Sequence, residues 1–312
     1  MASRPLRIMI AWRPGEYGTE TLAYAAWLAR TTKVQIRVVS ALSRGWPLTS
    51  LARLSTNDSW VSHETESLEK IIKDELKLAG LRKGMLDDDA VRIIESSSES
   101  TTICNEAEEF EADVVLLGTR RSNTKDWTAK NRSRFTAGST SDALLHYSPI
   151  PLGLAIPGAK LSKHGVTRVS ICYIDTPQSH HALNKAADLA YRWEVPLRLV
   201  SFTPRGATMY PTENGYGPSS DLMIEWREQA MGLLDRGMDR AHTRYPDLSI
   251  DAEVASGNGW EEAIQSIKWK KGDLLVLGSS TLGPFGRIFI GSSTNHIVRH
   301  SPVPCLLYTS PS

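Results

Sequence analysis

The chain carries one strand-and-turn segment twice, and this repetition limits its fold more than any other feature. The first copy, 112–118, reads Ala-Asp-Val-Val-Leu-Leu-Gly, and the second copy, 272–278, reads Gly-Asp-Leu-Leu-Val-Leu-Gly. Both runs are apolar between an aspartate and a glycine, which is typical of a parallel strand that is buried on both faces. The chain is therefore predicted to hold two related units.

Three further segments recur in the same order. The helix face Leu22, Ala25, Ala26, Ala29 returns as Leu183, Ala186, Ala187, Ala190; the strand 36–40 returns as 197–201; and the segment 146–151 returns as 300–304. Strands alternate with helices in both halves, which predicts an α/β protein with two tandem, doubly wound, five-stranded parallel sheets of the Rossmann-like type. The domains are predicted at 1–157 and 166–312, on either side of a polar linker that ends at Gly165.

Composition agrees with two globular domains and excludes several other classes. The chain has 312 residues, 41% hydrophobic and 23% charged, which leaves room for two domains of roughly 150 residues each. A net charge of +1 gives no reason to expect nucleic acid or a membrane as a partner. The three cysteines form no disulfide or metal pattern, and the N-terminus lacks the apolar core of a signal peptide, so we expect a cytoplasmic protein.

The repeated strand is followed each time by a glycine that opens a helix. In the second half Gly278 ends the strand, and Gly291 precedes the hydroxyl residues 292–294. In the first half Gly118 and Gly138 hold these places, 20 residues apart rather than 13. A helix N-terminus that faces the end of a parallel strand favours anions, because its backbone N–H groups are unpaired and the helix dipole is positive there. The sequence therefore predicts an anion site in the second half.

This arrangement resembles the signature of the universal stress protein family, G-x2-G-x9-G-S/T. Here the pattern reads Gly278, two residues, Thr281, nine residues, Gly291 and Ser292, so a threonine replaces the middle glycine. The resemblance covers nearly the whole chain as two tandem copies and implies the adenine nucleotide alpha hydrolase-like fold. It also implies an internal pseudo-dimer in which the last strand of each half takes part. Association of two chains and unknown protein partners are left open.

The family binds ATP, and the resemblance implies which residues would do so here. An aspartate at the end of the first strand contacts adenosine, Phe202 offers backbone groups to adenine, and the glycine-rich segment holds phosphate, with Mg²⁺ as counter-ion. The expected contacts are Tyr173, Ile174, Asp175, Phe202, Leu277, Gly278, Ser280, Thr281, Gly291, Ser292, Ser293 and Thr294. The side chain of Thr281 narrows the phosphate path, or its hydroxyl donates to phosphate. Two plainer interpretations stay open: Asp175 caps the following helix, and Gly291 begins an ordinary helix.

The first half departs from this pattern. Pro14, beside the cation Arg13, stands where the second half has Asp175. The loop 119–137 contains no glycine, and it carries six basic side chains against one acid, Asp126. We expect a degenerate copy whose loop is simply solvated; alternatively, the loop holds a phosphate or an acidic partner by side-chain charge.

Other motifs are weaker. The pairs His180/His181 and His296/His300 have no third ligand at a suitable spacing, so no metal site is expected. Asn258 and Glu261 have the spacing of a helix N-cap and its capping-box partner.

Three functions follow from these observations. The first is a stress-response regulator or sensor that binds an adenine nucleotide in its C-terminal domain, with no catalytic residues and at most slow hydrolysis. The second is a protein-interaction scaffold that binds no nucleotide. The third is an enzyme such as an ATP pyrophosphatase. It ranks last because segments 14–17 and 175–178 lack the Ser-Gly-Gly type of phosphate loop.

Overall fold

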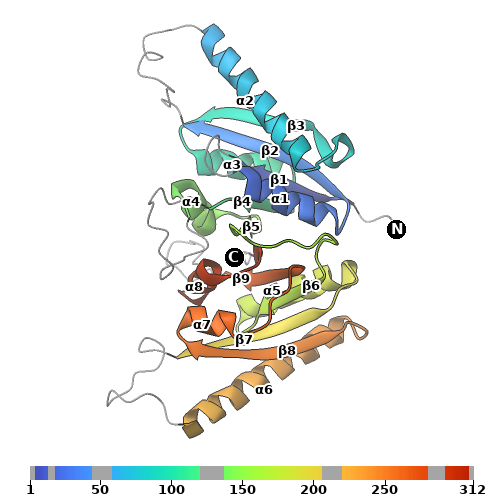
Figure 1. Cartoon of the computed structure of the whole chain (residues 1–312), viewed down its shortest axis with the longest axis vertical. Helices are drawn as coiled ribbons and strands as arrows, with labels where there is room; N and C mark the ends of the chain where they lie inside the picture. Colours follow the sequence, from blue (N-terminus) through green and yellow to red (C-terminus); the bar gives the residue numbers. More distant parts are fainter. Residues whose placement is uncertain are drawn as a thin grey trace. The chain divides into compact units, whose positions relative to one another are not determined.

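The computed structural model divides the chain into two compact units (Figure 1). The described residues are 4–12, 18–43, 58–119, 137–205, 220–279 and 292–308. Among them, the division between the units falls between Ala155 and Ile156. No helix within these ranges is long and apolar enough to cross a membrane.

The first unit is a five-stranded parallel sheet in the order β3-β2-β1-β4-β5. Its elements are β1 (Leu6–Ala11), α1 (Gly18–Ala29), β2 (Val34–Ser43), α2 (Asp58–Leu78), η2 (Lys83–Met85), β3 (Leu86–Ser96), α3 (Glu99–Glu109), β4 (Val114–Leu117), α4 (Ser139–Tyr147) and β5 (Leu152–Leu154). Since β1 lies between β2 and β4, the chain reverses its direction of growth beside β1. This is the doubly wound arrangement.

The second unit repeats this topology in the order β10-β9-β6-β7-β8, with every pair again parallel. Its elements are β6 (Arg168–Cys172), α5 (Pro177–Arg192), β7 (Leu197–Arg205), α6 (Ser220–Arg244), β8 (Ile250–Asn258), α7 (Trp260–Gln265), β9 (Asp273–Gly278), α8 (Ser292–His300) and β10 (Cys305–Tyr308). The prediction of two tandem five-stranded parallel sheets is confirmed.

The repeated apolar segments form the core of each unit. Strands β4 and β9 are buried along their apolar residues, as expected for strands covered on both faces. The helix face 183–190 buries its leucine and three alanines completely, so α5 packs closely on its sheet. The matching face of α1 is also buried, apart from the half-buried Ala29. Both helix faces were predicted from their spacing.

Each unit buries an arginine on its second strand, stacked on an aromatic ring. Arg37 on β2 lies over the Phe110 ring at 4.6 Å, and Arg198 on β7 lies over the Trp269 ring at 4.8 Å. In the first unit, Arg37 Nε and Nη2 donate to Asp87 Oδ2 at 2.9 and 2.6 Å. A guanidinium held by an aromatic face and a carboxylate keeps its charge although it is buried.

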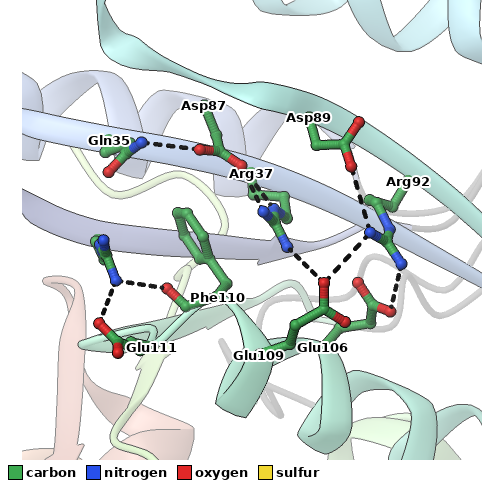
Figure 2. Close-up of polar contacts among 10 residues, drawn as sticks. Gln35, Arg37, Asp87, Asp89, Arg92, Glu106, Glu109, Phe110 and Glu111 are labelled. Carbon is green, nitrogen blue, oxygen red and sulfur yellow. Dashed lines mark hydrogen bonds and ion pairs between the residues drawn. The ribbon is translucent and has the colours of Figure 1, made fainter.

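A network of charged side chains extends from Arg37 along the edge strand of the first unit, and Figure 2 shows its members side by side. Arg92 on β3 donates to Glu106 at 3.0 Å and lies 3.5 Å from Glu109, which in turn lies 3.9 Å from Arg37. These contacts join β2, β3 and α3. A charged network on an edge strand also hinders pairing with the edge of another sheet.

The Arg37–Asp87 pair predicts how the stability of the first unit depends on pH. Burial raises the pKa of Asp87, but the bonds and charge of Arg37 outweigh it and set the pKa below its usual value of 3.8. The ionised carboxylate therefore stabilises the fold above the usual pKa, and this contribution is lost as the pH falls through the folded value. We expect Asp87→Asn to unfold at lower urea at pH 7 and to lose less stability than wild type between about pH 5 and about pH 3.

Urea unfolding monitored by tryptophan fluorescence at both pH values measures this effect. Asp88→Asn is the matched control, because the neighbouring Asp88 side chain is exposed. An acid sensitivity in Asp87→Asn equal to that of wild type contradicts the prediction.

Helix α6 approaches its sheet closely at one glycine. A Cβ atom at Gly237 would lie 2.7 Å from Leu199 Cδ2 and 2.7 Å from Tyr173 Cε1. Gly232 lies in the same helix, and a Cβ there would meet nothing within 4 Å. The absence of a side chain at Gly237 therefore lets α6 pack against the end of β6.

These two glycines form a matched pair. We expect Gly237→Ala to destabilise the second unit by about 1–3 kcal/mol, because the added methyl overpacks the contact with Tyr173. Gly232→Ala should instead stabilise it by about 0.5–1 kcal/mol, since alanine loses less conformational entropy in a helix. Thermal unfolding of both variants checks the sign, and two shifts in the same direction would contradict the packing argument.

Candidate functional site

The carboxyl end of β9 is bonded to the first turn of α8. Thr294 Oγ1 donates to the Gly278 carbonyl at 3.3 Å. The next residue, Ser279, is fully buried, and its N–H and hydroxyl both donate to the Tyr308 carbonyl, at 2.9 and 3.2 Å. The strand end, the helix start and the last strand of the unit are thus held together.

Gly278 leaves little room for a side chain. A Cβ atom there would lie 3.1 Å from the Gln178 carbonyl oxygen and 3.3 Å from Ala182 Cβ. The first turns of α5 therefore pack directly on the end of β9. A glycine at this position lets α5 approach the strand whose end meets α8.

The charges along α8 favour an anion at its N-terminus. Its first turn contains no acidic residue, while Arg299 and His300 lie in its last turn. Basic residues at the C-terminal end complement the helix dipole, and the positive N-terminal end carries no carboxylate of its own helix. The first N–H groups of a helix have no partner within the helix, so the start of α8 can offer backbone donors to a ligand. This geometry suits phosphate or another anion.

Asp175 follows β6, and its carboxylate is held from two sides. His180 Nε2 lies 2.7 Å from Oδ1, and Arg236 Nη2 lies 3.4 Å from Oδ2. The His180 bond lowers the pKa of Asp175, desolvation opposes this effect, and the bond and charge of Arg236 lower the pKa further. The carboxylate is therefore ionised at neutral pH. Its side chain is 39% exposed, so its remaining lone pairs can accept hydrogen bonds from a ligand.

The alternative that Asp175 caps the next helix is wrong. The N-cap of α5 is Thr176, whose hydroxyl oxygen accepts from the Ser179 N–H at 3.3 Å. Pro177 begins the helix, a position that proline favours. Because the cap lies one residue later, Asp175 is left to pair with side chains of α5 and α6.

Tyr173 lies beneath this carboxylate. It is 1% exposed, its ring stacks on His180 at 5.9 Å, and Gly237 of α6 packs against it. Burial raises the pKa of Tyr173, and the charge of Asp175 raises it further. Ile174 is half exposed between them, with its N–H donating to Ser179 Oγ at 3.1 Å. The exposed Ile174 offers apolar surface beside the carboxylate.

Phe202 on β7 and Leu277 on β9 belong to the two strands that flank β6, and both side chains are buried. The ladder between β6 and β7 ends where the Tyr173 N–H donates to the Val200 carbonyl at 2.9 Å. Phe202 lies two residues further along β7 and pairs with Ala255 of β8 on its other side. Its backbone on the β6 side therefore lies beyond the ladder, which is where the predicted contact with adenine requires it.

Four of the predicted contacts cannot be placed. Ser280, Thr281 and Gly291 lie outside the described residues, and so does the side chain of Ser292. Ser293 lies in the first turn of α8 and is partly buried. Their roles stay predictions.

Two residues of this cluster were missed by sequence reasoning. His180 was considered only as a metal ligand, and Arg236 lies 61 residues from Asp175 in the sequence. The position of His180 one turn into α5 gave some signal, whereas nothing in the sequence pointed to Arg236. No group of three or more His, Cys, Asp or Glu side chains that could hold a metal occurs in the described part of the chain.

The first unit has acidic side chains at the corresponding helix start. Gly138 is the N-cap of α4, and Asp142 lies in its first turn. Thr140 Oγ1 donates to Glu99 Oε2 at 2.6 Å. The start of α4 thus has two carboxylates in its vicinity, where the first turn of α8 has none. Pro14 and residues 120–136 of the basic loop lie outside the described residues.

The comparisons with known proteins agree with this duplication. The chain matches the sequence profile of the universal stress protein family twice, at residues 6–154 and 166–309. It is 31% identical over 310 residues to universal stress proteins of Mycobacterium bovis and Mycobacterium tuberculosis, covering 97% of this chain and 99% of each relative.

Solved structures support the fold. A universal stress protein from Archaeoglobus fulgidus superposes with a TM-score of 0.62 at 14% identity, over 98% of this chain and 99% of that one. A putative universal stress protein from Pseudomonas aeruginosa gives a TM-score of 0.55 at 12% identity, over 98% and 94%. With the family profile matched in both halves and relatives that align over nearly the full length, this chain belongs to the universal stress protein family and carries two copies of its domain.

Proposed function

We propose that the C-terminal unit binds an adenine nucleotide, ATP, and that the protein acts as a regulator or sensor in a stress response. The observation that carries this proposal is the bond from Thr294 to the Gly278 carbonyl, which joins the end of β9 to the first turn of α8. Ligands in doubly wound sheets bind outside the carboxyl ends of the strands, where strand order reverses. In this unit the reversal lies between β6 and β9.

Each part of the nucleotide has a proposed partner at this edge. The phosphates would lie at the start of α8, where Ser293, Thr294 and the backbone N–H groups supply donors, with Mg²⁺ as their counter-ion. The adenosine would lie toward Asp175, with the backbone of Phe202 beside the base. Thr281 and Gly291 complete the proposed phosphate contacts.

The proposal is a binding protein rather than a hydrolase. Among the described residues of the second unit, the carboxylate at the proposed site is Asp175, which is paired with His180 and Arg236. A base that activates water must reach the phosphate that is cleaved, and Asp175 is assigned here to the adenosine end. The proposed location is the cytoplasm, where ATP is available.

The N-terminal unit is proposed to lack nucleotide. Glu99 and Asp142 place negative charge near the start of α4, which repels phosphate. Pro14 also replaces the carboxylate that Asp175 supplies in the second unit. One nucleotide per chain is therefore the proposed stoichiometry.

Calorimetric titration of the full chain with ATP tests the proposal. We expect one binding site per chain, and Asp175→Ala should weaken binding by about tenfold to a hundredfold, because hydrogen bonds to charged groups contribute about 1.5–3 kcal/mol. Asp188→Ala is the matched control. Asp188 lies on α5, the helix that follows Asp175, but it pairs with Arg244 at 2.6 Å and should leave ATP affinity unchanged.

The absence of binding heat and of any ATP-dependent rise in melting temperature for wild type would reject nucleotide binding and favour the interaction scaffold. Mass spectrometry of the purified protein for adenosine phosphates provides an independent measurement. A phosphate-release assay on the same sample tests the enzyme alternative.

A further inference from the structure

His180 is bonded to Asp175 and is itself held in place by a ring. Its Nε2 lies 2.7 Å from Asp175 Oδ1, and its ring stacks on Tyr173 with 27° between the ring planes. An ionised carboxylate only accepts hydrogen bonds, so Nε2 must carry the hydrogen and donate it. His180 therefore has a defined tautomer and a defined ring plane at this contact.

The support of His180 continues into the core. Tyr173 is fully packed, and Gly237 of α6 lets the helix backbone approach the tyrosine ring. The next residue toward the helix start, Arg236, reaches Asp175 Oδ2 at 3.4 Å. A carboxylate with one oxygen fixed by an imidazole and the other facing a guanidinium has a restricted plane, although much of it is solvent-exposed.

We propose that His180 is a positioning residue that holds the Asp175 carboxylate as a bidentate acceptor for the two ribose hydroxyls of the nucleotide, and so makes the site selective for ribonucleotides over 2′-deoxyribonucleotides. The inference rests on the proposed nucleotide binding and adds the group that is recognised. A ligand that lacks the 2′-hydroxyl loses one hydrogen bond to the charged carboxylate, which is the source of the selectivity.

The ribose matches this carboxylate better than the adenine amine does. The two oxygens of a carboxylate lie side by side and suit two neighbouring donors, as vicinal hydroxyls present them. The amine can be met instead by the carbonyl groups of β7 near Phe202, where the ladder with β6 has ended.

A purely structural role for His180 predicts different behaviour from a positioning role. Its ring packs on Tyr173, whereas its N–H orients Asp175, and the two properties can be separated by substitution. His180→Phe keeps an aromatic ring but has no donor at Nε2. His180→Gln loses the ring but keeps an N–H donor on a side chain of similar length. The neighbouring His181, whose pKa is lowered by burial and by Lys185, makes no described contact with Asp175 and supplies the control His181→Gln.

The test is calorimetric titration of the full chain with ATP and with 2′-deoxy-ATP. We expect wild type and His181→Gln to bind ATP at least tenfold more tightly than 2′-deoxy-ATP. His180→Phe should reduce this ratio to about threefold or less, mainly by weakening ATP binding, and His180→Gln should restore most of it. Melting temperatures of all four proteins show whether each variant is folded.

Several outcomes overturn the inference, and they differ from failure of nucleotide binding. Equal affinity of wild type for ATP and 2′-deoxy-ATP removes the ribose contact while leaving the proposed function intact. A ratio that is preserved in His180→Phe but lost in His180→Gln assigns His180 a packing role only. If wild type binds neither compound, the proposed function itself fails. A titration with inosine triphosphate, which lacks the adenine amine, reports on that group. If His180→Phe loses a preference of wild type for ATP over inosine triphosphate, the contact lies at the base rather than at the ribose, and the inference is overturned.

Discussion

The structure of each unit depends on a buried arginine in the amino-terminal half of its sheet. Nearby carboxylates compensate the charge of this arginine. In the second unit, Asp273 is fully buried and accepts from Arg168 at 2.8 and 2.6 Å, while Arg198 lies 3.6 Å away and stacks on Trp269. Burial, followed by repulsion from Arg168, lowers the pKa of Arg198, and the nearby carboxylates oppose that effect. Removing one partner of such a group costs about 3–5 kcal/mol, so the strands β6, β7 and β9 are tied together at this end.

This arrangement leaves the carboxyl ends of the same strands free for chemistry. The apolar repeats lie in the core and the stacked arginines lie toward the amino ends, and both recur in the two units. The residues at the carboxyl ends differ between the units: Asp175 against Pro14, and a neutral first turn of α8 against Asp142 and Glu99 near α4. Duplication preserved the scaffold, while the charges near the two helix starts diverged. The proposed restriction of nucleotide to the second unit follows from that divergence.

The sequence predicted the parts of this structure that are periodic or local. Apolar strands and helix faces depend on neighbours in the chain, so the topology of both sheets was within reach. Capping was predicted less well. The predicted pair was Asn258 as N-cap and Glu261 as its partner. In the structure the N-cap of α7 is Gly259 at φ 86°, and the glutamate that accepts from the Asn258 N–H is Glu262, so both positions are shifted by one residue. A left-handed glycine shifted the helix start, and spacing alone does not reveal it.

The second partner of Asp175, Arg236, was out of reach for a different physical reason. His180 and Arg236 come from α5 and α6, and their meeting at one carboxylate depends on how far α6 sits from the sheet. Gly237 sets that distance, because its missing side chain admits the Tyr173 ring, and Tyr173 in turn supports His180. The packing of the core and the orientation of the proposed ligand-binding carboxylate are therefore linked through adjacent residues of one helix. A substitution that shifts α6 would alter the site without touching any residue that contacts the ligand.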